Sequence, residues 1–408
     1  MAIGKLIINV YTDSDAMPTD NVTVLVAGTN YYKEYKSDSN GKVYINDLTA
    51  PEKEYSLEPQ KKVKPYSTYN IKVMKKGLQT TIINGVEILP DETAIQNVYL
   101  SSGYGADMPD KIINIPEHVL WEDYPPKIPE DPIKDETEET RVMPAVLIPE
   151  YIIVHDGIPS NTSAANYYVS FPDYLKNVAS GEIYSTWPRE TIKANVHAIA
   201  SFTLNRIFTE WYKARGYNFT ITSSPQYDQM YSHGRTIYQT ISDVVDEVFN
   251  VYINLPGKKQ PFFAQYNDGI KTNNPGWLSQ WGSKELGERG YTAINILKHY
   301  YTPDLVLKTA DEIVGLPTSF PGYNMSLGSC GEPIQKMQNE LNVINGNYPG
   351  IPKVIPSDGQ YLDSTKKSVE AFQKAFSLPV TGVINFATWY KISYIFVAVS
   401  KMIQGVIS

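Results

Sequence analysis

One carboxylic acid in the sequence, Glu182, has surroundings that suit acid catalysis. It follows Gly181 within a largely apolar stretch that runs from Val178 to Trp187. Partial burial in such a stretch disfavours the charged carboxylate and so favours the protonated acid. A carboxyl group of this kind can donate a proton to a leaving group and then act as a base. We therefore predict that Glu182 is a general acid.

The elements that must position Glu182 belong to a mixed α and β unit, which we place at residues 150–318. It opens with a strand, where β-branched and aromatic residues cluster. Apolar residues at helical spacing predict a long helix with a proline in its first turn. The expected elements are, in order, a strand at 150–156, a helix at 188–214, a second helix at 237–249 and a strand at 251–255.

The composition is that of a globular protein with several folding units. The 408 residues predict two to four units of roughly 100 to 200 residues each. A formal net charge of −8 gives no basic surface for nucleic acid or anionic lipid, so no nucleic-acid partner is expected. The single cysteine, Cys330, excludes an internal disulfide and a cysteine-rich metal site.

The apolar runs of the chain are short. The first ten residues lack the apolar core and the cleavage site of a signal peptide. The late run from Ile395 to Val399 falls far below the roughly 20 residues of a membrane span. We expect a protein synthesised without a signal peptide and without a membrane span.

Residues 1–101 have the alternation of short strands. Several are expected, and Asn40-Gly41 is a strong hairpin-turn signal between two of them. A β-sandwich follows from this pattern. The segment with Asp38, Gly41 and Leu48 resembles the transthyretin-like domains related to the regulatory domain of carboxypeptidases. Examples of the expected strands are 5–11, 21–27, 69–74 and 94–100.

Residues 102–149 read as an acidic, proline-rich linker. Between Glu122 and Thr140 the chain has eight acidic residues against Lys127 and Lys134. Prolines remove backbone donors and oppose helix, so the stretch is a spacer or an extended tether that a protease can cut. We place the expected cut at 142–148.

Residues 319–408 contain a compact series of motifs. These are Leu327-Gly-Ser-Cys-Gly, Asp358-Gly-Gln-Tyr, Val369-Glu-Ala-Phe-Gln and a final Gly382-Val-Ile-Asn-Phe-Ala-Thr-Trp. In this order they resemble the peptidoglycan-binding type 1 module, which implies a three-helix bundle that binds cell-wall glycan or stem peptide. Helix-spaced aromatic residues are expected in its core, whereas Gln360 and Tyr361 are the expected binding residues at its rim. The expected fold class is therefore multidomain α+β, with an N-terminal β-sandwich, a central α/β domain and a C-terminal three-helix module.

The middle unit carries a second resemblance. Val178, Glu182, Trp187-Pro188 and Ile192-Lys-Ala-Asn resemble the domain named for stage II sporulation protein D, with further matches at Gln229-Met-Tyr and Gln280-Trp-Gly. With the acidic linker and the wall-binding end, the whole chain resembles the pro-forms of the cortex-lytic enzymes of anaerobic spore formers. That resemblance implies a zymogen in the spore, activated during germination by a subtilisin-like protease.

The same resemblance implies lytic transglycosylation of spore cortex peptidoglycan, with Glu182 as the catalytic residue. One carboxyl group suffices, because the 6-hydroxyl of muramic acid can close on C1 in place of water. Tyr227-Asp228 replaces the His and Cys cluster that can hold zinc in some relatives, so neither a metal nor a cofactor is expected. His197 is expected to be structural, and Arg206 does not occupy the arginine position of the family. The expected substrate-binding residues of this unit are Gln229, Tyr231, Gln280 and Trp281.

Two alternatives remain open. The chain could be a catalytically silent peptidoglycan-binding spore protein that keeps the fold without the chemistry. It could instead be a conventional hydrolase, in which a second carboxylate directs water. The candidates for that second carboxylate are Asp156, Glu190 and Asp268.

Overall fold

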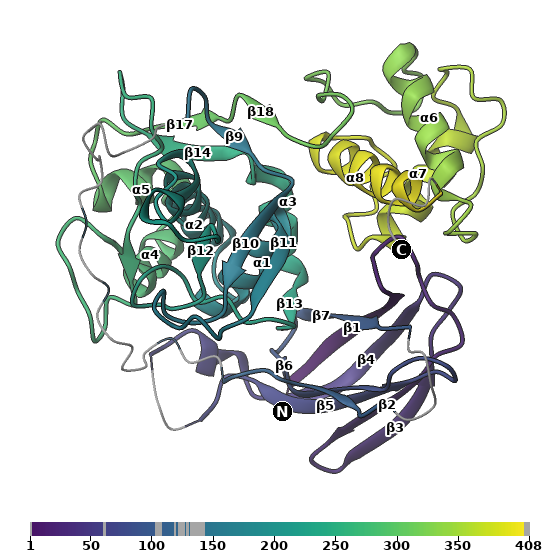
Figure 1. Cartoon of the computed structure of the whole chain (residues 1–408), viewed down its shortest axis with the longest axis horizontal. Helices are drawn as coiled ribbons and strands as arrows, with labels where there is room; N and C mark the ends of the chain where they lie inside the picture. Colours follow the sequence, from purple (N-terminus) through teal and green to yellow (C-terminus); the bar gives the residue numbers. More distant parts are fainter. Residues whose placement is uncertain are drawn as a thin grey trace.

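The computed structural model of the chain is a mixed α+β molecule built from two β-sheets, a central helical and stranded unit and a C-terminal helical module (Figure 1). It describes residues 2–59, 63–102, 108–117, 120, 127, 130 and 143–403. The predicted fold class is confirmed. In this part of the chain, no helix is long and apolar enough to cross a membrane.

The N-terminal strands form a sandwich of two sheets. One sheet has the order β3-β2-β5-β6-β8 and the other β13-β7-β1-β4. Alternate residues such as Leu6 and Ile8 of β1, and Val24 and Val26 of β2, are fully buried between them. The strands are β1 (Ala2–Thr12), β2 (Thr23–Gly28), β3 (Tyr31–Lys36), β4 (Lys42–Ala50), β5 (Ser67–Met74), β6 (Thr81–Ile88), β7 (Thr93–Leu100) and β8 (Lys111–Asn114).

The turn at Asn40-Gly41 does not make the expected hairpin. It joins β3 to β4, which lie in different sheets and pair with β2 and β1. Asp38 shapes the turn, because its Oδ1 accepts the N–H groups of Asn40 and Lys42, both at 2.9 Å. Gly41 has φ of 72°, and a side chain there would collide with the carbonyl of Val10.

The sandwich is continuous with the central unit. Strand β13 (Ile237–Tyr238), from the central unit, pairs antiparallel with β7 of the sandwich. Strand β8, from the segment expected to be a linker, pairs in parallel with β6. One connected hydrophobic core runs through both units. A cut in the linker therefore leaves the sandwich attached by a shared sheet and a shared core.

The central unit surrounds one buried helix, α2 (Arg189–Phe208). Helices α1, α3, α4 and α5 all pack against α2 (Figure 1). Short strand pairs border them in the orders β11-β10-β12, β14-β17, β15-β16 and β18-β9. The further helices are α1 (Phe171–Glu182), α3 (Gln239–Val248), α4 (Gln280–Glu288) and α5 (Ala293–Tyr300). The strands are β9 (Leu147–Ile148), β10 (Tyr151–His155), β11 (Asn166–Ser170), β12 (Ile221–Thr222), β14 (Val251–Asn254), β15 (Tyr266–Asn267), β16 (Leu278–Ser279), β17 (Val306–Thr309) and β18 (Glu312–Ile313).

Helix α2 is shorter than predicted and is buried on every side. It ends at Phe208, because Glu210 adopts a left-handed φ of 43° that a helix cannot contain. Thr209 closes the end by donating its hydroxyl to the carbonyl of Asn205 at 2.7 Å. Polar residues on the faces away from the apolar stripe are buried as well, among them Asn195, His197, Thr203 and Arg206.

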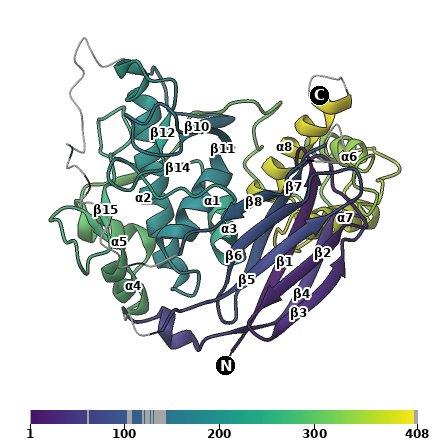
Figure 2. The ribbon, with the colours of Figure 1, turned by 60° about the horizontal axis from the view of Figure 1, so that its bottom comes forward.

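The C-terminal module has its own core. Its helices are α6 (Glu332–Ile344), α7 (Asp363–Ala375) and α8 (Phe386–Ile403). Phe372 and Trp389 are buried between them, as expected for helix-spaced aromatic residues. The core also takes in Ala16 of the sandwich, whose carbonyl accepts the side-chain amide of Asn347 at 2.8 Å. Figure 2 shows the module beside the sandwich strands.

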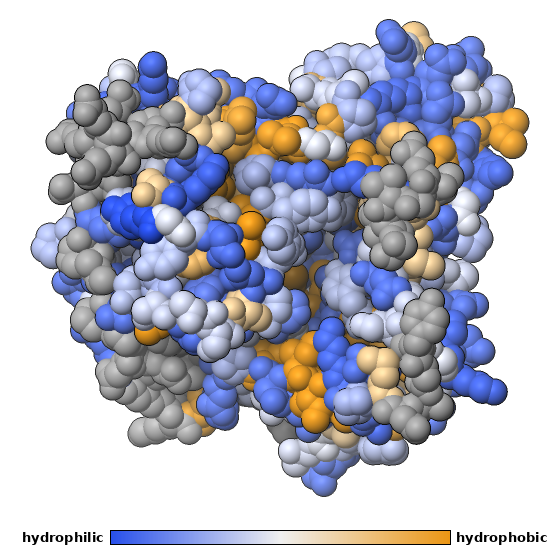
Figure 3. Space-filling model, viewed as in Figure 1, coloured by the Kyte–Doolittle hydropathy of each residue, from blue (hydrophilic) through white to orange (hydrophobic). Residues whose placement is uncertain are grey.

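The three units meet around an apolar cavity of about 250 Å³. Residues of the sandwich (Asp15), the central unit (Tyr151 and Phe249) and the module (Tyr390 and Tyr394) line it. Figure 3 shows apolar side chains along the seam between the central unit and the module.

Candidate functional site

Glu182 is the last residue of α1, and its side chain is partly exposed. The helix begins at a capped end, because Ser170 Oγ accepts the N–H of Asp173 at 3.3 Å and Pro172 occupies the first turn. Nearly all residues from Phe171 to Gly181 are buried against the central unit. The buried helix therefore holds Glu182 in place at its C-terminal end.

Three donors from distant segments converge on the Glu182 carboxylate. The backbone N–H of Met230 donates to Oε1 at 3.0 Å, and the Tyr266 hydroxyl donates to the same oxygen at 3.2 Å. The side-chain amide of Gln280 donates to Oε2 at 3.0 Å. Donors to both oxygens stabilise a charged carboxylate. In the intact chain these three donors therefore fix the orientation of the Glu182 carboxylate.

Lys127 brings a positive charge from the linker to this site. Its Nζ lies 3.8 Å from the ring centroid of Tyr266, the residue whose hydroxyl binds Glu182. Burial lowers the pKa of Lys127, and the nearby charges of Glu182 and Asp228 oppose that lowering. Within the described residues this ammonium has no hydrogen-bond partner, so the aromatic ring and the two carboxylates are what attract it.

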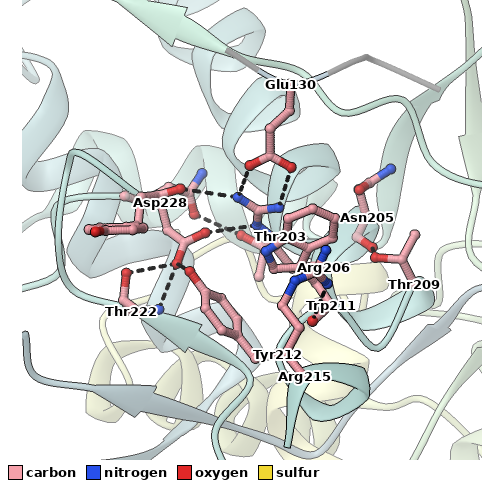
Figure 4. A network of polar contacts seen from close by, with 12 residues as sticks. Glu130, Thr203, Asn205, Arg206, Thr209, Trp211, Tyr212, Arg215, Thr222 and Asp228 are labelled. Atoms are coloured by element: carbon pink, nitrogen blue, oxygen red, sulfur yellow. Dashed lines mark hydrogen bonds and ion pairs between the residues drawn. The ribbon is translucent and has the colours of Figure 1, made fainter. Parts of the chain in front are cut away.

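A second charged cluster lies next to this site and is centred on Arg206 (Figure 4). Its Nε donates to Oδ1 of Asp228 at 2.8 Å, and its terminal nitrogens donate to the two oxygens of Glu130 at 3.0 and 2.7 Å. Asp228 also accepts the hydroxyl of Tyr212 at 2.6 Å and the N–H and hydroxyl of Thr222 at 2.9 and 2.7 Å. Burial alone would lower the pKa of Arg206, but the two carboxylates raise it overall.

Of the four predicted substrate-binding residues in this unit, only Gln280 contacts Glu182. Trp281 is buried against Trp187, with ring centroids 4.9 Å apart, and its indole N–H reaches the carbonyl of Leu120 at 3.4 Å. Its predicted place in a sugar groove is wrong, because the indole packs in the core.

Gln229 does not line a groove either. Its side chain is fully buried, where its Oε1 accepts the hydroxyls of Tyr174 and Thr203 at 3.0 and 2.8 Å. Its amide donates to the carbonyl of Ile199 at 3.2 Å. Gln229 therefore ties α1 to α2 and keeps the next residue, Met230, in place to donate to Glu182.

Tyr231 lines a polar cavity of about 610 Å³ between β8 and the central unit. Met230 lines the same cavity, so its backbone separates this space from Glu182. The rings of Tyr167 and His233 stack at one wall, 3.9 Å apart and almost parallel. Glu182 itself does not line this cavity. The space lies directly behind one of the three donors to the candidate acid.

The three alternative carboxylates have different surroundings. Glu190 accepts the first N–H of α5, from Ala293 at 2.7 Å, and so caps that helix. Asp268 accepts backbone N–H groups of the turn that follows it, including that of Ile270 at 3.0 Å. Only Asp156 lines the polar cavity, where the hydroxyl of Ser223 donates to it at 3.1 Å.

In the C-terminal module, Gln360 is exposed but Tyr361 is not. The Tyr361 side chain is fully buried, and its hydroxyl donates to the carbonyl of Gly382 at 2.8 Å. The predicted rim position of Tyr361 is therefore wrong, because its side chain lies in the core while that of the preceding residue, Gln360, is exposed. Gln360 lies at the surface, and its role in binding stays a prediction.

His197 is held inside the core, where its Nδ1 lies 3.3 Å from the carbonyl of Val251. Burial lowers the pKa of His197 to about 4. No group of three His, Cys, Asp or Glu that could hold a metal ion occurs among the residues that the structure places.

Comparison with known proteins bears on the C-terminal module. Residues 330–392, which span α6, α7 and the beginning of α8, match the model of a peptidoglycan binding domain. This part of the chain is a peptidoglycan-binding module. It explains the second similarity, to the zinc D-Ala-D-Ala carboxypeptidase of Streptomyces albus G, which is 35% identical over 68 residues. That match covers 17% of this chain and 25% of the carboxypeptidase, so the chain spans a quarter of that relative's length.

Similarity to solved structures is limited to parts of the chain. The Bacillus anthracis TIE protein matches with a TM-score of 0.19 and 14% identity, covering 25% of this chain and 17% of that one. A mutant type II cohesin-X-dockerin complex from Acetivibrio cellulolyticus matches with a TM-score of 0.16 and 19% identity, covering 24% of this chain and 53% of that one. Both scores are too low to indicate a shared fold.

Sequence reasoning missed several residues of the site. Tyr266 and Glu130 have no local pattern that marks them, and Arg206 and Asp228 were noted only as departures from a family pattern. Met230 lay within a matched segment, Gln229-Met-Tyr, but its contribution is a backbone N–H, which its side-chain type does not reveal. Lys127 was hidden in a segment whose composition indicated only a spacer.

Proposed function

We propose that the chain is a peptidoglycan lytic transglycosylase that uses Glu182 and is made as a zymogen. The observation that supports this most is the convergence of Met230, Tyr266 and Gln280 on a partly exposed carboxylate in a chain that carries a peptidoglycan-binding module. Three independent segments fix the orientation of one acid, which is what a group that must meet a bond at a set position requires.

In the proposed reaction, protonated Glu182 donates its proton to the oxygen between two sugars. The bond from C1 of muramic acid to that oxygen then breaks, and positive charge grows on C1. The resulting carboxylate is stabilised by its three donors. It next takes the proton of the muramic acid 6-hydroxyl as that oxygen attacks C1. The product is a 1,6-anhydro sugar, and no water is consumed.

The linker supports the zymogen part of the proposal. Lys127 lies over the ring of Tyr266 and its charge is attracted by Glu182, so the linker is held against the candidate acid. Displacing Lys127 would free the space beside Glu182 for a glycan strand.

A cut between Glu130 and Met143 would free the residues that hold the site in this state. Part of this interval, 131–142, lies outside the described residues. Of the predicted cut region, Val146 and Ile148 are buried, and β9 pairs in parallel with β18. A protease needs an extended, accessible chain, so the region is accessible only before Val146.

We further propose that the substrate is spore cortex peptidoglycan, that the protein resides in the spore, and that a subtilisin-like protease activates it during germination. These points rest on the resemblance of the chain to cortex-lytic enzymes. The peptidoglycan-binding module supports the coarser part, which is attachment to the wall polymer.

The test compares the cut chain with its Glu182→Gln variant on purified peptidoglycan. Mass spectrometry of the released fragments should show 1,6-anhydro-muramic ends with the parent and none with the variant. If neither the parent nor the variant released fragments, the proposal would be contradicted and a catalytically silent wall-binding protein would be favoured. Free reducing ends from the parent would favour a hydrolase, and Asp156→Asn would then identify its second carboxylate.

A further inference from the structure

Arg206 holds a carboxylate of the linker in a way that a ligand carboxylate could replace. Each terminal nitrogen donates to a different oxygen of Glu130, at 3.0 and 2.7 Å (Figure 4). This parallel pair of hydrogen bonds is how arginine recognises planar carboxylates. Glu130 also donates its backbone N–H to the side-chain oxygen of Gln265 at 3.3 Å. The linker is thus anchored here by a charge and by its backbone.

The two carboxylates on Arg206 differ in how permanently they are held. The side chains of Arg206 and Asp228 are 1% and 0% exposed, whereas that of Glu130 is 17% exposed. Asp228 is fixed by Tyr212 and Thr222 as well as by Arg206, whereas Glu130 belongs to the linker and keeps part of its side chain exposed. Asp228 is therefore part of the fold, and Glu130 is the partner that can leave.

When Glu130 leaves, the terminal nitrogens of Arg206 need another hydrogen-bond acceptor. One terminal nitrogen also donates to the carbonyl of Tyr227 at 3.1 Å and would keep that bond, but each would lose its bond to Glu130. Buried donors of a charged group are costly when they are unpaired. Because Asp228 and Tyr227 keep the guanidinium fixed, the N–H groups that faced Glu130 stay in the geometry that fits another carboxylate. The vacated position is a preformed binding site for that chemical group.

This position adjoins Glu182. The guanidinium carbon of Arg206 lies 5.2 Å from the ring centroid of Phe202, and Lys127 lies 5.4 Å from the same ring. Phe202 is next to Tyr266, with ring centroids 6.5 Å apart, and Tyr266 donates to Glu182. The rings of Phe202 and Tyr266 thus lie between the carboxylate position and the candidate acid.

We propose that Arg206 is an exchangeable carboxylate-binding site. In the intact chain it holds Glu130, and after the linker is cut it holds a free carboxylate of the peptide stem of peptidoglycan. The identity of that ligand rests on the proposed function, whereas the exchange does not. A bound stem carboxylate would fix the glycan strand while its sugar meets Glu182.

The exchange can be tested without any turnover. The full chain carrying Glu182→Gln is labelled with ¹⁵N-arginine, and N-acetyl-D-alanine is titrated as the carboxylate probe. Glu130→Gln, in the same chain, should make the Arg206 side-chain signals shift saturably with the probe, whereas the chain with Glu130 should show no shift. Glu210→Gln is the matched control. In the described part of the chain, the only ion pair of Glu210 is the one with the exposed Lys213, at 2.7 Å.

Adding Arg206→Lys to the Glu130→Gln chain should abolish the response, because lysine cannot form the paired hydrogen bonds. If Glu130→Gln folds poorly, a chain with a specific protease site between residues 131 and 142 replaces it, and the cut form should respond where the uncut form does not. No response in any released form, or an equal response with Glu130 in place, would overturn the exchange. A response to the probe, together with no cleavage of peptidoglycan by the cut chain that keeps Glu182, would instead leave the exchange standing and contradict the proposed function.

Discussion

The side-chain amide of Gln280 donates to Oε2 of Glu182 at 3.0 Å, although 98 residues separate the two. Gln280 is the first residue of α4, where Ser279 caps the helix by accepting the N–H of Gly282 at 3.0 Å. The amide is buried, so its rotamer is set by packing. The capped start of one helix therefore orients the acid at the end of another.

Replacing Gln280 by leucine should impair cleavage without unfolding the protein. The lost hydrogen bond to a charged group is worth roughly 1.5 to 3 kcal/mol, so kcat/KM should fall about 10- to 100-fold. Initial rates of wall solubilisation at several substrate concentrations would check this effect. An unchanged kcat/KM would show that Gln280 does not orient Glu182.

Replacing Lys127 by methionine should activate the uncut chain. Methionine keeps most of the volume over the Tyr266 ring but removes the charge through which Glu182 attracts the linker. We expect the uncut variant to release anhydro-muramic fragments at a rate nearer to that of the cut chain. Lys258→Met, at an exposed position of the same unit, is the control and should leave the uncut chain inactive. An inactive Lys127→Met chain whose cut form is active would show that the charge is not what restrains the site.

The N-terminal sandwich should stay attached after the linker is cut. Strand β13 pairs with β7, and Gln96 bonds to the carbonyl of Gly234 at 2.9 Å and to the hydroxyl of Thr236 at 2.8 Å. We expect the two pieces of a chain cut between residues 130 and 143 to elute together from a size-exclusion column. Elution as two separate peaks in buffer without denaturant would contradict this.

Replacing Asp228 by alanine should destabilise the fold strongly. The change leaves Arg206 buried with only the partly exposed Glu130 as a counter-charge. Breaking a buried pair in this way costs about 3 to 5 kcal/mol of unfolding free energy. Asp47→Ala is the control, because Asp47 pairs with Lys33 at a surface site where both side chains are about half exposed, and surface pairs are worth about 1 kcal/mol or less. Urea unfolding measures both, and equal losses would mean that the Arg206 cluster does not support the fold.

The stability of the interface between the sandwich and the module should depend on pH through Lys42. Its Nζ donates to the hydroxyl of Ser377, in the module, at 2.9 Å. Burial, with smaller effects of Lys391 and Lys374, lowers the pKa of Lys42 to about 7, although Asp38 opposes the shift. Between that value and the ordinary 10.5 the unfolded chain binds more protons than the folded chain, so unfolding free energy should rise with pH over this range. Lys42→Met should flatten this rise in urea titrations between pH 7 and 10, and an equally steep rise in the variant would assign it to other groups.

Local sequence patterns predicted where the helices and turns lie better than they predicted what these elements pack against. The spacing of apolar residues located α2, but it could not show that the opposite face, with Asn195 and Thr203, is buried as well. The pair Asn40-Gly41 predicted a turn correctly, yet the pairing of β3 and β4 with different partners depends on contacts far along the chain.

The candidate site could be predicted only in part, because its residues come from segments far apart in the sequence. Glu182 is marked by its own neighbours in sequence, whereas its donors Met230, Tyr266 and Gln280 come from 48, 84 and 98 residues away. Gln280 was found through a resemblance and Tyr266 was not found at all. The contacts of Lys127 and Glu130 arise only because a segment with the composition of a spacer lies against a folded site.

The most direct measurement of the central claim is digestion of purified peptidoglycan by the cut chain in water enriched in ¹⁸O. If the 6-hydroxyl of muramic acid closes on C1 while Glu182 takes its proton, the new chain ends should be 1,6-anhydro sugars that carry no ¹⁸O, and Glu182→Gln should produce none of them. New reducing ends that carry ¹⁸O would show that water attacks C1. That result would contradict the transglycosylase mechanism.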